Sequence, residues 1–340
     1  MLGIQNSATD TDQSPVARRT WRSFLLPFII FGCAVLAMAV QKFRLTGQPP
    51  FLHRESVWSV AIYEGPSPLE LSPTSADGRP VLSAADVTDI PALFVADPFM
   101  IQDDNQWFMF MEVMNRDTQQ GDIALATSPD GLQWNYAGIV LDEPHHLSYP
   151  LVFKFDDQWY LLPQSDVGVE LYRAEEFPHR WKRVHTILRG SQLADPTLFQ
   201  HDDLWWMFVG KSATHDELRL FYATDLLSDW TEHPQSPLIT ANAEISRPGG
   251  RIIRWDESLI RLAQDCAPKY GNQLRGFRIT KLTTTEYSEE PIAQEVILKG
   301  GSHDWNSKGM HHCDAHQIEP DLWRAAVDGH RKTWILQATP

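Results

Sequence analysis

Cysteine and positive charge are both scarce in this sequence of 340 residues. It has three cysteines, and only Cys266 and Cys313 lie beyond an apolar N-terminal segment, so export would permit at most one disulfide there. Whether these two pair stays open. Lysine and arginine number 29 against 44 aspartate and glutamate, a formal net charge of −15. A field of that sign repels a phosphate backbone, so we expect no nucleic-acid partner.

Long hydrophobic runs are also rare, and the one that stands out covers residues 24–40. Its 17 residues are uncharged, and basic residues flank it on both sides. A membrane span needs roughly 17–25 apolar residues, and basic residues before the span favour a cytoplasmic N-terminus. We therefore expect a cytoplasmic tail at 1–23 and a transmembrane signal-anchor at 24–40. The rest of this single-pass membrane protein would lie on the extracytoplasmic side.

Two other interpretations of the same segment stay open. Residues 37–39 (Ala-Met-Ala) fit the small-x-small pattern of a cleavage site, which would make the segment a removed signal peptide. Cys33 follows Gly32 as a lipoprotein cysteine would, although Phe31 is bulky for that motif and the apolar run continues past it.

The remaining sequence contains five copies of one pattern: a short apolar strand, an acidic turn and a second apolar strand. The copies begin at Asp97, Tyr149, Asp195, Arg247 and Asp314. The first and third match most closely, because both start Ala-Asp-Pro and have a tryptophan ten residues after the aspartate. Repeats of about this length, with four short strands each, are typical of propeller blades. We expect an all-β fold, a five-bladed β-propeller over 55–340, after a linker at 41–54 and the N-terminal transmembrane or signal helix.

The starting residues of the copies should converge, because the innermost strand of each propeller blade begins near the central axis. Buried charges cost desolvation unless they are paired, so this gathering indicates a functional site, although hydrogen bonds that cap the inner strands would also explain it. Cleavage of a glycosidic bond needs one ionised carboxylate and one neutral acid. Asp97 and Asp195 are the expected catalytic pair, but Arg247 would lower the pKa of Asp195. Other candidate acids are Glu112, Glu244 and Asp265.

The residues expected to bind a ligand are Tyr149, Arg247, Asp265, His312 and Asp314. His312, Asp314 and His316 alternate, so an extended strand would point them to one face, where a divalent cation such as calcium could bind. Ligands that are adjacent on one strand rarely complete a metal site, and the sequence has no CxxC or HExxH motif, so we expect no metal and no other cofactor. Arg247 suits a carboxylate or phosphate, which indicates an acidic sugar or a phosphosugar headgroup.

Six groups of residues together carry a family resemblance. They are 146–150 (HLSYP), 169–174 (VELYRA), 194–199 (ADPTLF), 246–251 (SRPGGR), 263–266 (AQDC) with 270–271 (YG), and 309–312 (GMHH). With them, about residues 55–335 resemble the glycoside hydrolase 43-like propeller family. That family includes the N-terminal domain of plant glucosamine inositolphosphorylceramide transferase and bacterial relatives.

The resemblance implies a five-bladed propeller that handles glycans. It does not imply sugar transfer, which in the plant proteins looks to belong to a separate C-terminal glycosyltransferase domain. Compared with arabinanases and xylosidases, Asp97 matches the general base and Asp195 the aspartate that modulates the pKa of the acid. Arg247 stands where those enzymes carry the catalytic Glu, and Gln164 stands where family members carry another Glu.

Three functions remain open from the sequence. The first is a membrane-anchored, exported enzyme that acts on glycosidic bonds of a polysaccharide or glycolipid, with Asp97 as base. The second is a non-catalytic glycan-binding or accessory module for a separate glycosyltransferase. The third is a protein-interaction propeller. The expected partners are a carbohydrate or glycolipid headgroup and, through the N-terminal segment, a membrane.

Overall fold

The computed structural model describes residues 22–47, 49 and 52–336. Most of the tail predicted at 1–23 therefore lies outside the described residues. The chain divides into two compact units, one of which is Ser56–Thr333. The other combines the chain up to Glu55 with the chain from Trp334 onward.

The N-terminal unit contains one helix, α1 (Arg22–Thr46). Within it, Pro27–Leu45 is long and apolar enough to cross a membrane, and none of this segment is buried against the protein. The helix continues through residues 41–46, so the first part of the expected linker is helical. Such a helix is compatible with a single-pass membrane protein and equally with a signal sequence.

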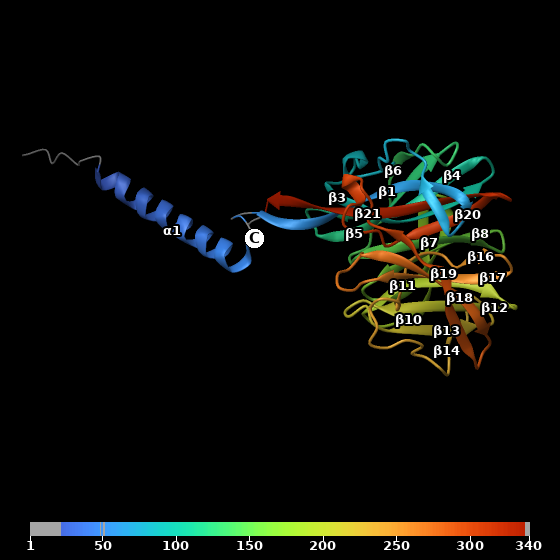
Figure 1. Ribbon diagram of the computed structural model, residues 1–340. Coiled ribbons are helices and arrows are strands. Elements are labelled where there is room, and N and C mark those ends of the chain that lie inside the picture. Colours follow the sequence, from blue (N-terminus) through green and yellow to red (C-terminus); the bar gives the residue numbers. More distant parts are fainter. Residues whose placement is uncertain (1–21, 48, 50–51, 337–340) are drawn as a thin grey trace, which may run out of the picture. The chain divides into compact units, whose positions relative to one another are not determined.

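Ser56–Thr333 confirms the predicted five-bladed propeller, because its strands form five antiparallel sheets (Figure 1). The first two sheets are β3 (Ala92–Asp103), β4 (Gln106–Asn115), β5 (Gln120–Ser128), β6 (Asn135–Leu141), and β7 (Leu147–Phe155), β8 (Gln158–Ser165), β9 (Gly168–Glu176), β10 (Arg180–Arg189). The next two are β11 (Leu193–His201), β12 (Leu204–Lys211), β13 (Leu218–Ala223), β14 (Thr231–Glu232), and β15 (Arg247–Pro248), β16 (Ile253–Trp255), β17 (Ser258–Asp265), β18 (Gln273–Leu282), β19 (Tyr287–Lys299). Short 3₁₀ helices occupy Ala84–Asp86 and Asp304–Asn306.

The fifth blade is assembled from both ends of the propeller sequence. Its strand order is β2 (Glu70–Pro73), β1 (Leu52–Ser67), β21 (Leu322–Leu336) and β20 (Cys313–Glu319). In Figure 1 the blue β1 accordingly runs beside the red β21. The repeats predicted β20 and β21 but not this pairing, which closes the ring and removes the free edges that separate terminal strands would leave.

The blades are apolar on both faces because each packs against two neighbours. In β4 the buried run Met109–Val113 is continuous instead of alternating, and β12 shows the same pattern over Trp205–Gly210. A sheet that is covered on both sides needs apolar side chains at successive positions. The inner strands contact one another around the axis, as β7 does with β3 and β11.

Three inner strands carry the same irregularity near their start. The pairing register shifts at Ala96/Phe99, at Ser148/Leu151 and at Ala194/Thr197. Inside these shifts Asp97, Tyr149 and Asp195 adopt φ values of 52°, 48° and 49°, and each precedes a proline. A β-bulge redirects a side chain relative to the regular strand. The repeat therefore gives these three residues one shared backbone geometry.

Because β1 closes the ring, we expect truncation of a buried apolar side chain on β1 to lower the free energy of unfolding substantially. Ile62 is 2% exposed, so Ile62→Ala should lower the free energy of unfolding of the full chain by about 2–5 kcal/mol. The matched control is Val167→Ala, because Val167 is 48% exposed. Urea unfolding in detergent micelles measures both variants, and equal effects would show that β1 does not hold the blade together.

Candidate functional site

Four of the five expected ring residues begin the inner strands, and the fifth position differs. In the first blade, Asp97 lies five residues before Gln102, which pairs with the tryptophan of the repeat. In the fifth blade, the residue that pairs with the corresponding tryptophan is Gln317, which places His312 at the equivalent position in place of Asp314. The fifth copy lacks the proline that follows the aspartate in the first and third copies, so no local residue pattern indicates which residue of its inner strand faces the ring.

Asp195 and Arg247 form a buried ion pair at the centre of the ring. The Arg247 Nε atom lies 2.5 Å from Oδ2 of Asp195, and Nη2 lies 3.2 Å from Oδ1. Gln264 donates to the same Oδ2 at 2.6 Å, while the backbone N–H of Asp195 donates to Gln164 at 3.0 Å. Burial opposes the charge on Arg247, but Asp195 outweighs burial and raises the pKa of the guanidinium. Both oxygens of the Asp195 carboxylate therefore already accept hydrogen bonds from protein donors.

A second buried cluster surrounds Asp97. His311 contacts Asp328 through Nδ1 at 2.8 Å, and its Nε2 lies 3.8 Å from Oδ1 of Asp97. The backbone N–H of Asp97 donates to Asp328 at 3.0 Å. The Nε2–H of His312 donates to the Pro98 carbonyl oxygen at 3.1 Å, and Nδ1 of the same ring lies 3.9 Å from Oδ1 of Asp97. Within the described residues, Oδ1 of Asp97 has no hydrogen-bond partner, although it is buried.

The titratable members of this cluster differ in the direction of their pKa shifts. Burial raises the pKa of Asp97 to about 7, with smaller contributions from Asp328 and Asp195. Burial likewise raises the pKa of Glu112 well above its usual value, and Asp97 adds to this. His311 overcomes the burial of Asp328 and lowers its pKa, while Asp328 raises the pKa of His311. An ionised pair therefore lies beside two carboxyls that tend to stay protonated, which is the separation that acid–base sites use.

The cluster also has a composition that suits a cation. Asp97, His311 and Asp328 each offer one ligand atom, and these atoms lie within 4.8 Å of one another. Carboxylate and imidazole ligands fit several divalent metals, but the imidazole must be neutral to bind. The trio proposed from the sequence is arranged differently, because Asp314 contacts His316 at 2.9 Å and His312 faces Pro98.

Tyr149 lies in the core and does not face a cavity. The residue is 0% exposed, and its hydroxyl group contacts Thr197 at 2.8 Å and accepts the N–H of Gly250 at 2.7 Å. The ring packs edge-on against Phe99 and His312. Tyr149 thus ties three blades together, and burial raises its pKa well above the usual value.

Asp265 and Glu244 meet Arg275 and not Asp97. Asp265 is 2% exposed and lies 2.9 Å from Nη2 of Arg275. The side chain of Glu244 is 57% exposed and lies 3.8 Å from the same nitrogen. The structure therefore does not bring Glu244 into the carboxylate cluster. Glu112, on the strand next to Asp97, is the acid that joins it.

Two aromatic side chains form a wall beside the cluster. Trp58 of β1 stacks on His311 with ring centroids 3.9 Å apart, and Tyr270 meets His311 edge-on at 5.2 Å. Arg247 lies over the Tyr270 ring at 5.1 Å. Tyr270 is 39% exposed, which leaves part of its ring accessible. We call Trp58 and Tyr270 the aromatic wall.

Sequence reasoning did not assign roles to His311, Asp328 or Trp58. Asp328 had a usable signal, because it lies on the second strand of its repeat, five residues after the tryptophan, as Glu112 does in the first blade. Trp58 had none, since its position depends on the pairing of β1 with a strand from the other end of the propeller sequence.

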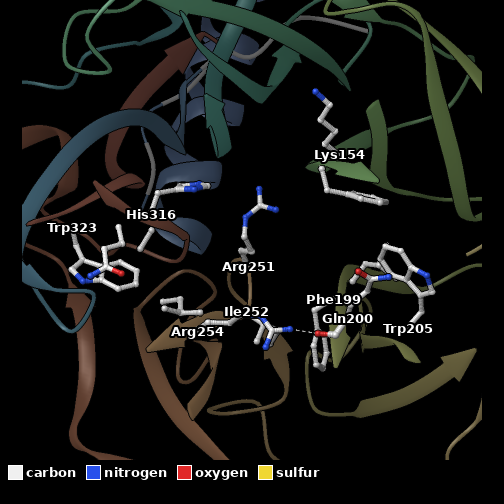
Figure 2. A pocket seen from close by; sticks show the side chains of 14 residues that line it. Lys154, Phe199, Gln200, Trp205, Arg251, Ile252, Arg254, His316 and Trp323 are labelled. Atoms are coloured by element: carbon white, nitrogen blue, oxygen red, sulfur yellow. Dashed lines mark hydrogen bonds between the residues drawn. The ribbon is translucent and has the colours of Figure 1, made fainter. Parts of the chain in front are cut away.

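Two adjoining cavities of about 430 and 400 Å³ lie at the opposite end of the inner strands. Figure 2 shows the first of them. Arg251, His316 and Lys154 line both of them. These cations already have carboxylate partners: Asp314 lies 2.8 Å from Arg251 and 2.9 Å from His316, and Asp103 lies 3.6 Å from Lys154. Asp314 thus orders this far end, and the two positive neighbours hold its pKa below the usual range against burial.

The packing role of Tyr149 predicts a loss of stability without a loss of ligand binding. Tyr149→Phe keeps the ring but leaves the Gly250 N–H unsatisfied, so the free energy of unfolding should fall by about 1–3 kcal/mol. Urea unfolding of the full chain measures this. A variant with unchanged stability and impaired glycan binding would instead restore the ligand-binding role predicted from the sequence.

The raised pKa of Asp97 predicts a pH dependence of stability. Because its folded pKa is about 7 and the usual value is 3.8, the folded state binds more protons between these values. This carboxyl therefore favours folding below about pH 4, and the contribution is lost as the pH rises to about 7. Over that interval, the free energy of unfolding of Asp97→Asn should decline less steeply than that of the wild type. Asp103→Asn, on the same strand, is the control, and parallel curves for all three proteins would contradict the prediction.

Comparisons with known proteins agree with the fold and identify relatives. Residues 52–330 match the family model described as glucosamine inositolphosphorylceramide transferase 1, N-terminal. The chain is 38% identical over 327 residues to glucosamine inositolphosphorylceramide transferase 1 of Oryza sativa subsp. japonica, covering 89% of this chain and 44% of that protein. Identity to the Arabidopsis thaliana protein of the same name is 34% over 305 residues, covering 82% and 40%. The chain thus spans less than half the length of these curated relatives.

Solved glycosidase structures share the propeller. The catalytic domain of a Coprinopsis cinerea GH62 α-L-arabinofuranosidase has a TM-score of 0.53 at 12% identity, covering 79% of this chain and 97% of that one. A Bombyx mori GH32 β-fructofuranosidase has a TM-score of 0.54 at 15% identity, covering 73% and 64%. At such identities the likeness concerns the fold alone. From the family match and the plant relatives, the chain belongs to the family of the N-terminal domain of glucosamine inositolphosphorylceramide transferase 1.

Proposed function

We propose that the propeller binds the sugar headgroup of a glycolipid or polysaccharide at the Asp97 cluster. The observation that carries this proposal is Oδ1 of Asp97, a buried acceptor without a hydrogen-bond partner among the described residues. A buried acceptor of this kind costs free energy unless a ligand satisfies it, and a sugar hydroxyl group is a suitable donor. The adjacent aromatic wall offers the apolar surface on which sugar rings stack.

Arg247 supports this site by positioning and not by direct recognition. Each nitrogen of its guanidinium already has a protein partner, since Nε and Nη2 contact Asp195 and Nη1 contacts His215 at 2.9 Å. The ion pair holds Asp195 and the inner strands in place and supports the Tyr270 ring. An acidic group of the ligand would therefore need another cation.

Cleavage of a glycosidic bond is a second candidate function. The raised pKa values of Asp97 and Glu112 favour it, because a carboxyl that stays protonated near neutral pH can act as a general acid. The arrangement of the cluster favours binding instead, since both carboxyls belong to one blade and Arg247 occupies the position opposite. The usual mechanism needs two carboxyls that flank the bond.

The family suggests a setting for glycan recognition. The relatives are named as transferases of an inositolphosphorylceramide, and this chain matches less than half of their length. We propose that the chain is a single-pass membrane protein, anchored by α1, whose propeller on the extracytoplasmic side presents a glycolipid headgroup to a separate glycosyltransferase. The apolar, unburied segment Pro27–Leu45 and the family match support this.

The test combines binding and product release on the full chain in detergent micelles. A panel of soluble glycans and glycolipids is screened for binding by calorimetry and for release of reducing sugar. Asp97→Asn should weaken binding of the recognised glycan about tenfold or more, because an amide replaces one carboxyl oxygen and a buried hydrogen bond to the sugar is left unmade. Asp103→Asn, at the other end of β3, should leave the affinity unchanged.

The outcomes separate the two functions. Binding without product release supports recognition, whereas release that Asp97→Asn abolishes establishes a glycosidase. If Asp97→Asn binds every glycan as well as the wild type does, the cluster is not the glycan site.

A further inference from the structure

A cavity of about 400 Å³ lies on the other side of the aromatic wall from the Asp97 cluster. Its lining residues are Ser56, Pro268, Lys269, Tyr270, Asn272, Lys308, His330 and Lys332. Tyr270 belongs to both the cavity and the wall, and Trp58 stacks on His311 at 3.9 Å and on His330 at 4.3 Å. We call this cavity the lysine pocket.

The lysine pocket concentrates positive charge that the protein does not neutralise. Lys269, Lys308 and Lys332 come from separate parts of the chain, and no carboxylate lines the pocket with them. None of the three forms an ion pair with a carboxylate of the described residues, although the whole chain has 44 acidic and 29 basic residues. The cations of the far cavities in Figure 2 differ, because there Asp314 and Asp103 provide partners. Three like charges around one cavity repel each other unless an anion joins them.

His330 is a second and independent sign of a missing partner. The residue is 4% exposed, and neither ring nitrogen has a well-aligned hydrogen-bond partner among the described residues, where its polar contact is with the Gly271 backbone. A neutral imidazole offers one N–H donor. Buried polar groups are rarely left unpaired, which indicates that a ligand acceptor belongs beside this ring.

We propose that the lysine pocket is a binding site for a phosphate group. A phosphate monoester carries about −1.5 to −2 charges and three strong acceptor oxygens, which match several ammonium groups and one imidazole N–H. Lysine ammonium groups bind phosphate as point charges, whereas a lone carboxylate would more often be gripped by the planar fork of arginine. The cavity is larger than one phosphate, so the bound group would carry a further substituent.

The pocket is adjacent to the Asp97 cluster but is independent of it. A ligand with both a sugar and a phosphate could contact the two sites across Tyr270. The phosphate site nevertheless rests on the lysines and His330 alone. It stands even if the cluster around Asp97 binds no glycan.

The test uses the full chain in micelles of a neutral detergent, with inorganic phosphate as the probe and calorimetry as the measurement. The pocket variant is Lys269→Gln/Lys308→Gln/Lys332→Gln. The matched control is Lys154→Gln/Lys182→Gln/Lys281→Gln, which removes three exposed lysines outside the pocket and changes the net charge equally. All six side chains are exposed, so both variants should fold, and circular dichroism checks this. The pocket variant should bind phosphate about tenfold or more weakly, whereas the control should match the wild type.

Other variants separate this site from the glycan site. His330→Phe keeps the stacking on Trp58 but removes the donor, so it should weaken phosphate binding while the Asp97→Asn variant binds phosphate normally. If the pocket variant and the control variant weaken phosphate binding equally, the proposal is overturned, because the effect then comes from the net charge of the protein and not from the pocket. Absence of saturable phosphate binding by the wild type would overturn it too.

The source of the phosphate is distinguished by competition. The wild type is placed in nanodiscs of phosphatidylcholine alone or with added phosphatidylinositol 4-phosphate, whose headgroup carries a phosphate monoester, and soluble glucose 1-phosphate is titrated into each. If the inositol lipid competes with glucose 1-phosphate for the wild type but not for the pocket variant, the ligand is a lipid headgroup. Equal binding of glucose 1-phosphate in both nanodiscs identifies a soluble phosphosugar.

Discussion

Closure of the ring is the constraint on which the rest of this structure depends. Five twisted sheets can surround one axis only if the last blade joins the first, and here β1 achieves this by pairing with β21. Once the ring is closed, the inner strand of every blade begins at the same end. Bulges in three of these strands then aim Asp97, Tyr149 and Asp195 from equivalent positions. The positions of these residues on the inner strands, and not their mutual attraction, therefore bring them close together.

Bringing charges to one axis requires that most of them be neutralised there. Asp195 is paired with Arg247, and Asp328 is paired with His311. Within each pair, short charge-assisted hydrogen bonds offset the free-energy cost of removing both side chains from water. Asp97 and Glu112 have no such short pairing in the described part of the chain, and burial raises their pKa values against the weaker opposing effects of His311 on Asp97 and of Arg247 on both. The acid–base chemistry of the site therefore depends on Asp97 and Glu112, the two carboxyls without a close cationic partner among the described residues.

Repeats made the fold predictable, whereas the site was only partly so. The spacing from aspartate to tryptophan revealed the blades and placed Asp97, Asp195 and Arg247 on one ring. It failed in the fifth copy, where the residue type matched Asp314 but the register selects His312. The pairing of two distant strands leaves no local pattern, so the place of Trp58 in the aromatic wall could not be foreseen, whereas the exposed Tyr270 was recognisable as a stacking surface. Burial and charge pairing, which decide each pKa, depend on such distant contacts.

The stacking of Trp58 between His311 and His330 has a consequence for the order of events during synthesis. Trp58 is translated near the beginning of the propeller and His330 near its end, and local contacts form much faster than ones so distant in sequence. Neither histidine can gain its aromatic neighbour until the last blade has emerged from the ribosome. A chain interrupted before residue 311 therefore holds Trp58 and the carboxylates of the early blades without the two histidines against which Trp58 stacks.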